Sequence, residues 1–252
     1  MKYIIIFAVI LSFYSFFRKG ESLKNSAQHK GIVGEKRVKK ILQRLSNKKY
    51  IVINDIMVPS DSDIKHTQID HIVISTHGIF VIETKNYSGI VYGKANSEYW
   101  YKDTGSRVLK FRNPLKQNYA HIMGLQKALN MKQESFISIA AFSDKCILNI
   151  DNDTDSNVVN FKDLKSTIKS YRDILIDKSQ LITIKDKIYE YNIHSSKIRD
   201  KHAKVVQRKI DSEKPYMNIC PLCGCRLIKK QGRYGYFMGC SNYPKCRFTS
   251  DI

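Results

Sequence analysis

The chain has 252 residues, with 43 Lys and Arg against 23 Asp and Glu, so that its formal net charge is +20. Hydrophobic residues make up 42% of it, which is enough to bury a folded core and excludes a disordered basic protein. A single stretch is apolar enough to consider for membrane insertion, which excludes a multi-span membrane protein, and the charge excess predicts a polyanionic partner, either nucleic acid or an anionic membrane surface.

The first element is an uncharged apolar run over residues 3–17, between Lys2 and Arg18-Lys19. It is shorter than the ~17–25 residues of an ordinary spanning helix. A cleaved signal peptide needs small residues after its apolar core, whereas bulky aromatic residues lead straight into Arg18-Lys19 here. We therefore expect a single-pass membrane anchor, and the positive charge after it predicts that the rest of the chain faces the cytoplasm. The alternative is an apolar first helix that packs on the folded domain.

Helical spacing follows over residues 31–45. It places Ile32, Val38, Leu42 and Leu45 along one face, together with Glu35. A carboxylate on such an apolar stripe is unusual, so Glu35 needs an explanation.

Two strongly β segments, QIDHIVIST and IFVIETK, are separated by His77-Gly78 and predict a hairpin. With His77 and Gly78 as its turn residues, Asp70 pairs with Lys85. Because side chains alternate between the faces of a strand, we expect Asp70, Glu83 and Lys85 to project from the same face.

Such a group has a chemical and a structural interpretation. Two neighbouring carboxylates bind a hard divalent cation through oxygen ligands, and an adjacent Lys orients a water for attack on a phosphate. The structural alternative is a cross-strand ion pair of Asp70 with Lys85 beside a solvated Glu83, which contributes only ~0.2–1 kcal/mol.

Short β-type segments are predicted on both sides of the hairpin, at residues 50–54, 90–93, 99–102 and 108–111. Asn113-Pro114 supplies a cap and a first-turn Pro for a helix to about Met131. Phe136–Phe142 reads as a buried strand with Cys146–Ile150 as its partner. From Phe161 onward the pattern is helical and increasingly charged, which indicates a basic linker more than a core element.

Five of the six cysteines gather near the C-terminus. Cys220-x2-Cys223 and Cys240-x5-Cys246 bracket 16 residues, a spacing that lets two knuckles meet around one structural Zn²⁺. Clustered cysteines in a cytoplasmic segment indicate a metal site more than disulfides. Cys225 could compete as a ligand, but it is left out of the expected set because binding by it would strain the first knuckle.

Cations alternate with aromatic residues in the same segment. Aromatic rings stack on unpaired bases and cations follow the phosphates, so this pattern predicts a single-strand DNA surface. The alternative is that the aromatic residues form the small core of the zinc module. The residues that we expect at the DNA surface are Arg226, Lys229, Arg233, Tyr236, Tyr243 and Lys245.

The phrases QIDHIVIS and GIFVIETKNYSG resemble the nuclease-related domain (NERD) family, a branch of the PD-(D/E)xK restriction-endonuclease-like superfamily. Asp70 matches the catalytic Asp of the family, and Glu83 and Lys85 match its E-x-K pair. The resemblance implies a mixed α/β sheet with flanking helices and a metal-dependent phosphodiesterase that acts on nucleic acid. In that mechanism Asp70 and Glu83 hold Mg²⁺ or Mn²⁺ and Lys85 positions the attacking water.

Three further residues enter through the same resemblance. Gly34-Glu35 resembles the opening G-E helix motif, in which a Glu commonly joins the metal site. Gln117 and His121 look like the helix after the hairpin, where some relatives carry Gln-x-x-x-Tyr that supports the active site or contacts DNA; His121 stands in place of the Tyr. The alternative for both residues is a polar stripe at the edge of a helix. No small-molecule cofactor is implied.

The phrase CPLCGCRLIKKQGRYGYFMGCSNYPKC resembles the four-Cys zinc finger at the C-terminus of type IA DNA topoisomerases. The catalytic core of a topoisomerase has no room in this chain, so that activity is not implied. The predicted organisation is an anchor helix at 3–17, the nuclease-related domain at 31–150, a helical basic linker at 160–214 and a zinc ribbon at 216–252. We expect a membrane-anchored, metal-dependent nuclease acting on DNA; the alternative is a catalytically inactive DNA-binding or tethering protein with the same fold.

Overall fold

The computed structural model describes residues 29–251, apart from short gaps at 61–64, 106–107, 152–156, 213–218, 221 and 234. The expected anchor at 3–17 lies outside the described residues. Within the described ranges, no helix has the length and apolar character needed to cross a membrane.

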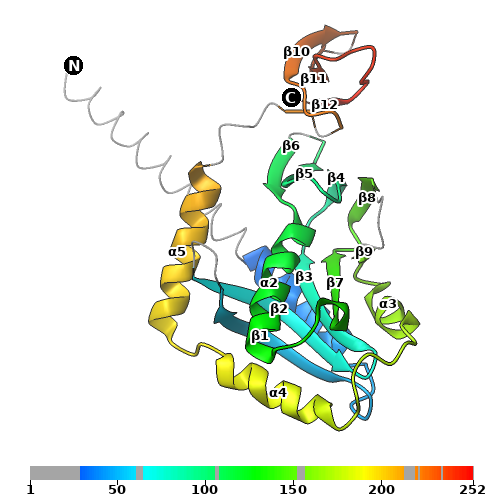
Figure 1. Ribbon diagram of the computed structural model, residues 1–252. Helices are drawn as coiled ribbons and strands as arrows, with labels where there is room; N and C mark the ends of the chain where they lie inside the picture. Colours follow the sequence, from blue (N-terminus) through cyan, green and yellow to red (C-terminus); the bar gives the residue numbers. More distant parts are fainter. Residues whose placement is uncertain are drawn as a thin grey trace, which may run out of the picture.

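The expected mixed sheet with flanking helices is confirmed. Five strands form the first sheet in the order β1 (Ile51–Pro59), β2 (His66–Ser75), β3 (Gly78–Lys85), β7 (Phe136–Phe142) and β9 (Asn157–Asn160). The strand β2 runs antiparallel to both of its neighbours, β1 and β3, whereas β7 and β9 run parallel to β3. The predicted hairpin is therefore the centre of this sheet (Figure 1).

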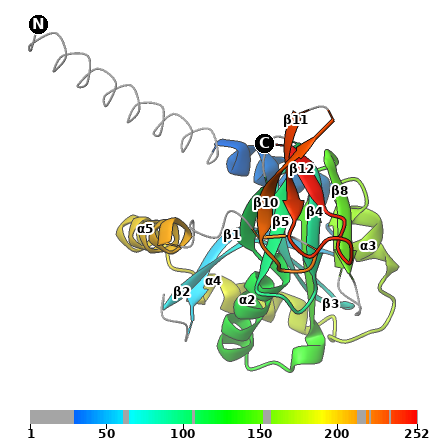
Figure 2. The same ribbon diagram turned by 90° about the horizontal axis from the view of Figure 1, so that it is seen from above.

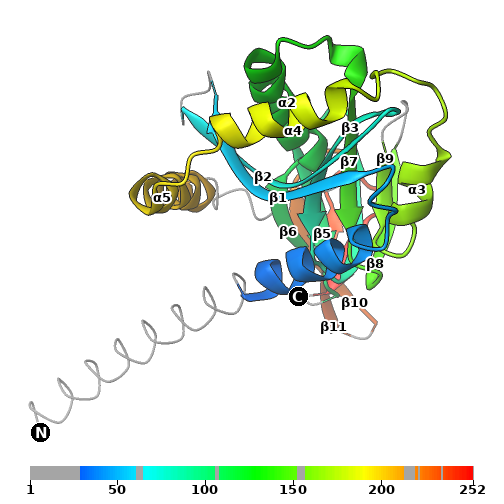
Figure 3. The ribbon, with the colours of Figure 1, turned by 90° about the horizontal axis from the view of Figure 1, so that it is seen from below.

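Helices cover both faces of the first sheet, as Figure 3 shows. On one face lie α2 (Pro114–Leu129) and α4 (Gln180–Tyr191), which bury Ile122 and Ile188. On the other face lie a helix over residues 29–42 and α3 (Leu164–Ser170), and the former buries Leu42. Burying each such side chain contributes about 1.5–3 kcal/mol, so these contacts hold the layers together.

Four strands form a second sheet in the order β6 (Val108–Arg112), β5 (Tyr99–Asp103), β4 (Gly89–Lys94) and β8 (Cys146–Asp151). The prediction that β8 pairs with β7 was wrong, because β8 runs parallel to β4. In the first sheet Lys85 at the end of β3 aligns with Phe142 at the end of β7. Four residues further along each of these two segments, Gly89 aligns with Cys146 in the second sheet. The parallel pair β3/β7 thus continues into the second sheet as the pair β4/β8.

The segment after β9 is helical but is more than a linker. The helix α4 lies within the core through Leu181, Ile184 and Ile188, so its apolar face outweighs the charge pattern that suggested a linker over 160–214. The next helix, α5 (Ser196–Ser212), is tied to β1 by Arg199, whose Nη1 donates to Asp55 Oδ1 at 2.8 Å.

The C-terminal module is a three-stranded sheet of β10 (Leu227–Gly232), β11 (Gly235–Cys240) and β12 (Thr249–Asp251). It lies against the second sheet, as the orange and red strands beside β4–β6 show in Figures 1 and 2. Leu227 and Phe248 of the module form one buried cluster with Val108 of β6.

Candidate functional site

The hairpin turn between β2 and β3 differs by one residue from the predicted turn. Ser75 pairs with Gly78, so that the turn residues are Thr76 and His77. The Ser75 hydroxyl accepts a hydrogen bond from the His77 amide at 3.1 Å. Gly78 has φ +126°, a conformation that favours glycine. These two residues fix the turn one position earlier than the His77-Gly78 assignment.

The pairing of Asp70 with Lys85 was therefore wrong. The register runs to His71 opposite Ile82, and its continuation sets Asp70 opposite Glu83. The error amounts to two positions, which is one full side-chain period of a strand. Asp70, Glu83 and Lys85 consequently still share one face, which is the face covered by α2.

Asp70 is fixed by the backbone of the neighbouring strand. Its Oδ2 accepts from the Thr84 amide at 2.8 Å. Burial raises the pKa of Asp70 well above its usual range, and the negative charge of Glu83 acts in the same direction, while the Thr84 amide opposes both. The ionised form of Asp70 is therefore only partly compensated by its surroundings.

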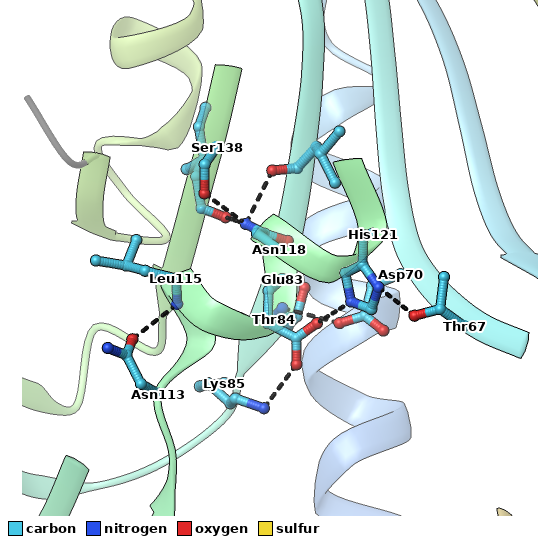
Figure 4. A network of polar contacts seen from close by, with 12 residues as sticks. Thr67, Asp70, Glu83, Thr84, Lys85, Asn113, Leu115, Asn118, His121 and Ser138 are labelled. Atoms are coloured by element: carbon cyan, nitrogen blue, oxygen red, sulfur yellow. Dashed lines mark hydrogen bonds and ion pairs between the residues drawn. The ribbon is translucent and has the colours of Figure 1, made fainter. Parts of the chain in front are cut away.

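Glu83 is buried, with 6% of its surface exposed, and both its oxygens are engaged (Figure 4). Oε1 accepts from Lys85 Nζ at 2.6 Å, and Oε2 lies 3.3 Å from His121 Nε2. Burial acts to raise the pKa of Glu83, but Lys85 and His121 outweigh it and lower the pKa to about 2. For Lys85, burial acts to lower the pKa, but Glu83 prevails and raises it, so this ammonium stays charged.

His121 links Glu83 to a residue that the sequence did not point to. Its Nδ1 lies 2.5 Å from the hydroxyl of Thr67 on β2. With the Thr67 hydroxyl donating to Nδ1, the Nε2–H is free to donate to Glu83. The hydrogen-bond chain Thr67–His121–Glu83 joins β2, α2 and β3, and it orients the Glu83 carboxylate through Oε2 (Figure 4).

Gln117 lies one turn before His121 on α2 and is half-buried. Its Oε1 is buried, and no hydrogen-bond partner exists for it among the described residues. The neighbouring Asn118, which sequence reasoning missed, donates to the backbone oxygens of Val81 and Ile139. Asn118 thereby fixes the position of α2 over β3 and β7, and in this position His121 contacts Glu83.

Glu35 approaches from helix 29–42. The buried face of this helix runs through Gly34 and Val38, so Ile32, two residues from Gly34 and about 200° round the helix, is 42% exposed instead of buried as predicted. A Cβ on Gly34 would lie 2.5 Å from Asn86 Cβ, so glycine permits this close approach. Burial raises the pKa of Glu35, and the charges of nearby acids, Glu83 among them, add to this.

Asp55 of β1 is a third residue that the sequence did not indicate. It has φ +56°, a left-handed conformation that Asp tolerates better than most residues. Its Oδ1 accepts from Gln68 and from Arg199 of α5, both at 2.8 Å. Its charge also raises the pKa of Glu35. An acid inside an otherwise apolar β segment was the available signal.

The residues at this end of the hairpin fit a hard divalent cation in ligand type and charge. Glu35, Asp70 and Glu83 supply carboxylate oxygens, the ligands that Mg²⁺ prefers. Glu83 raises the pKa of both other acids, which shows that the negative charges lie close enough to interact and that a cation would relieve their repulsion. Their oxygens are not gathered as tightly as the ligand atoms of the cysteine cluster described next.

The four predicted zinc ligands, Cys220, Cys223, Cys240 and Cys246, come together. Among the described residues, they are the group of three or more potential ligands whose ligand atoms all lie within 4.8 Å of one another. The Sγ–Sγ distance is 3.5 Å for Cys220 and Cys246 and 3.3 Å for Cys223 and Cys240. Zn–S bonds of ~2.3 Å in a tetrahedron need sulfurs about 3.8 Å apart, so the cluster fits a structural Zn²⁺. Cys225 lies outside this group.

The predicted DNA-surface residues are all exposed, and they are Arg226, Lys229, Arg233, Tyr236, Tyr243 and Lys245. Lys229 Nζ lies 4.1 Å from the ring centroid of Tyr236, and Lys230 Nζ lies 5.1 Å from that of Tyr243. By contrast, Phe248 is buried and serves the small core. The aromatic residues thus divide between the two roles that the sequence left open.

Comparisons with known families agree with the two resemblances. Residues 30–143 match the family described as nuclease-related domain, and residues 217–252 match the topoisomerase DNA binding C4 zinc finger. An uncharacterized protein of Bacillus anthracis is 35% identical over 208 residues, which cover 82% of this chain and 95% of that protein.

The ribbon has its own relatives. DNA topoisomerase 1 of Methanocaldococcus jannaschii is 65% identical over 34 residues, which cover 14% of this chain and 4% of that enzyme. DNA topoisomerase 1 of Methanothermobacter thermautotrophicus is 61% identical over 33 residues, or 13% of this chain and 5% of that enzyme. A crystal structure of a protein of unknown function matches 73% of this chain and 100% of its own, with 12% identity and a TM-score of 0.29, too low to support an argument.

Proposed function

The chain belongs to the nuclease-related domain family and carries a topoisomerase-type C4 zinc ribbon, and on that premise we propose that it is a metal-dependent nuclease that hydrolyses phosphodiester bonds in DNA. The observation that carries this proposal is the arrangement at one end of the hairpin. Asp70 is fixed on the Thr84 amide, and Glu83 lies between Lys85 and His121. The chain thus carries both the acids and the cation that the reaction needs.

In the proposed reaction Asp70 and Glu83, with Glu35 in support, would hold Mg²⁺ or Mn²⁺. Such an ion would act as a Lewis acid, lowering the pKa of water and offsetting the charge of the phosphate. Lys85, charged and 2.6 Å from Glu83, orients the attacking water and offsets negative charge on the scissile phosphate. His121 keeps the Glu83 carboxylate in place, and the unpaired Oε1 of Gln117 is an acceptor for a water or a DNA group.

The alternative is a catalytically inactive protein that binds or tethers DNA with the same fold. One observation favours it: Lys85 and Glu83 satisfy each other in a buried ion pair, which is also what a purely structural pair would do.

A cleavage assay separates the two. The purified full chain should degrade DNA when Mg²⁺ or Mn²⁺ is present, and Lys85→Ala should abolish cleavage while DNA binding persists. Lys85→Arg is the folding control, because it keeps the positive charge beside Glu83 yet changes the geometry of the group that orients the water. A wild type that binds DNA but cuts none of a range of substrates with either metal would establish the tethering alternative.

The membrane part of the proposal rests on sequence alone. Residues 3–17 would anchor the chain in a single pass, with the nuclease-related domain and ribbon in the cytoplasm, as the flanking Arg18-Lys19 suggests. The full chain should then remain with membranes after extraction at high pH, and a variant without residues 3–17 should be released. If both forms behave alike, the anchor is refuted without affecting the nuclease proposal.

A further inference from the structure

The zinc ribbon is packed on the second sheet. Its buried Leu227 and Phe248 share one cluster with Val108 of β6. Tyr92 of β4 meets Phe248 edge-on, with ring centroids 5.5 Å apart. The ribbon therefore lies directly on this face of the sheet.

The ribbon face that makes this contact also carries a cation and an exposed ring. Side chains two residues apart share a face, so Lys229 lies on the same side of β10 as Leu227, and Tyr236 on the same side of β11 as Met238. Leu227 and Met238 both pack in the contact with the second sheet. Beyond them, Lys229 Nζ lies 4.1 Å from the ring centroid of Tyr236, which is 58% exposed.

Beyond the contact, the sheet face under the ribbon also carries a lysine beside a tyrosine ring. Lys110 lies two residues beyond Val108 on β6 and pairs with Tyr101, and Tyr99 lies two residues from Tyr101 on β5. Lys110 Nζ lies 3.6 Å from the ring centroid of Tyr99. On the same face, Ile147 of β8 is 66% exposed. A second cation with a ring thus adjoins the contact from the sheet side.

The ribbon is positively charged, because residues 217–252 contain six Lys and Arg against one acid. The sheet face under it presents three cations, Lys94, Lys110 and Arg112, and two acids, Asp103 and Asp151. Two of the cations on the sheet face, Lys94 and Arg112, pair with exposed acids at 3.7 and 3.5 Å. Exposed pairs of this kind are weak, so a phosphate can compete for these cations.

We propose that the ribbon and the adjoining part of the β4–β6 face form one continuous platform for single-stranded nucleic acid. Bases stack on half-buried Tyr99 and exposed Tyr236, and phosphates lie at Lys110 and Lys229. Aromatic rings favour unpaired bases, because the bases of a duplex are already stacked on one another. The inference rests on the proposed function only in taking nucleic acid as the ligand; it requires no cleavage.

The test is binding of a labelled oligothymidylate to the full chain, without added divalent cation, over a range of salt concentrations. Lys110→Ala and Lys229→Ala should each lower the slope of log affinity against log salt by about one unit. Lys187→Ala, which removes an exposed cation from α4, is the matched control and should leave the slope unchanged. Tyr99→Ala should weaken binding roughly tenfold, whereas Tyr99→Phe should not.

Each outcome separates the platform from the nuclease proposal. If Lys229→Ala reduces the slope and Lys110→Ala does not, the ribbon acts alone and the platform is refuted, while the nuclease proposal stands. If these variants lose binding as predicted and the wild type never cuts DNA, the platform is supported and the nuclease proposal is refuted. Equal affinity for a duplex of the same length, or an effect of Lys110→Ala confined to acidic vesicles, would also refute the platform. Zinc content and melting temperature verify the fold of each variant.

Discussion

His121 Nε2 lies 3.3 Å from Glu83 Oε2, and this contact joins helix α2 to the end of the hairpin strand that carries the E-x-K pair. The contact reaches the carboxylate on the oxygen that Lys85 does not occupy. Glu83 is thereby held from two sides, by Lys85 on one carboxylate oxygen and by His121 on the other.

Replacing His121 should weaken metal-dependent cleavage. We expect His121→Ala to reduce activity or metal affinity roughly 10- to 100-fold, because an outer partner that orients a ligand carboxylate is lost. The measurement is the Mg²⁺ dependence of the cleavage rate. Tyr119→Ala removes an exposed ring from the same helix and should change neither value. An unaltered Mg²⁺ dependence in His121→Ala would refute the orienting role.

Asp70→Asn should raise the melting temperature of the metal-free protein at neutral pH. The pKa of Asp70 is higher in the folded protein than in the unfolded chain, so its ionised form opposes folding there. The advantage of the variant should shrink as the pH falls through the raised pKa, because the wild-type carboxyl is then protonated. Mg²⁺ should stabilise the wild type more than the variant. A lower melting temperature of the variant at neutral pH would contradict this account.

Glu83 should behave in the opposite sense. Its pKa is lowered to about 2, below the usual value of 4.5, so its contribution to stability is present above pH 4.5 and is lost as the pH falls toward 2. Lys85→Ala leaves this buried carboxylate without its cation and should destabilise the fold by about 3–5 kcal/mol. Chemical denaturation at neutral pH measures the loss, and Lys85→Arg should recover most of it.

Gly34→Ala should perturb the site through the backbone. The new Cβ would lie 2.5 Å from Asn86 Cβ, and we expect a loss of about 1–3 kcal/mol from overpacking, with lowered cleavage because Glu35 moves. Gly31→Ala is a matched control on the same helix: no atom lies within 4 Å of its Cβ, and alanine favours a helix by about 1 kcal/mol. Equal stability of the two variants in thermal melts would show that the close approach of helix 29–42 to Asn86 is unimportant.

Zinc removal should release the ribbon from the second sheet. Cys240→Ser should lose the metal, whereas Cys225→Ser should retain it, since Cys225 lies outside the four-cysteine group. Zinc content by elemental analysis gives the direct comparison. The fluorescence of Tyr92, which contacts Phe248, should change in Cys240→Ser but not in Cys225→Ser. Zinc loss in both variants would add Cys225 to the site.

Much of the site was predictable from the sequence, because the predicted register was wrong by two residues and two residues are the side-chain repeat of a strand. The turn was misplaced by one residue, yet Asp70, Glu83 and Lys85 stayed on one face, since the register moved by two. What fixed the true turn was a local hydrogen bond from the His77 amide to Ser75, which alternation of apolar residues does not encode.

Other parts depended on contacts between distant segments. Thr67 gains its role only because His121 of α2 lies beside it. Asp55 gains its role only because Arg199 of α5 reaches it, so the polar character of Asp55 within its β segment could not assign the role by itself. The prediction did not place Gly34 on the buried face of its helix, because helical periodicity is read from apolar side chains and glycine has none. The pairing of β8 with β4 likewise depends on where β3 and β7 end, not on the composition of β8.

The continuation of β3/β7 into β4/β8 places Lys85 at the seam between the two sheets. Its carbonyl accepts from the Ser143 amide at 3.0 Å, and the Gly89 amide, four residues on, donates to the carbonyl of Lys145 at 3.2 Å. The ribbon follows Lys85 by more than a hundred residues in the chain, yet it is seated on the sheet that begins four residues after it. Because the ribbon rests on a sheet whose strands continue from β3 and β7, a displacement of the ribbon would reach the E-x-K segment through β4, without passing along the intervening chain.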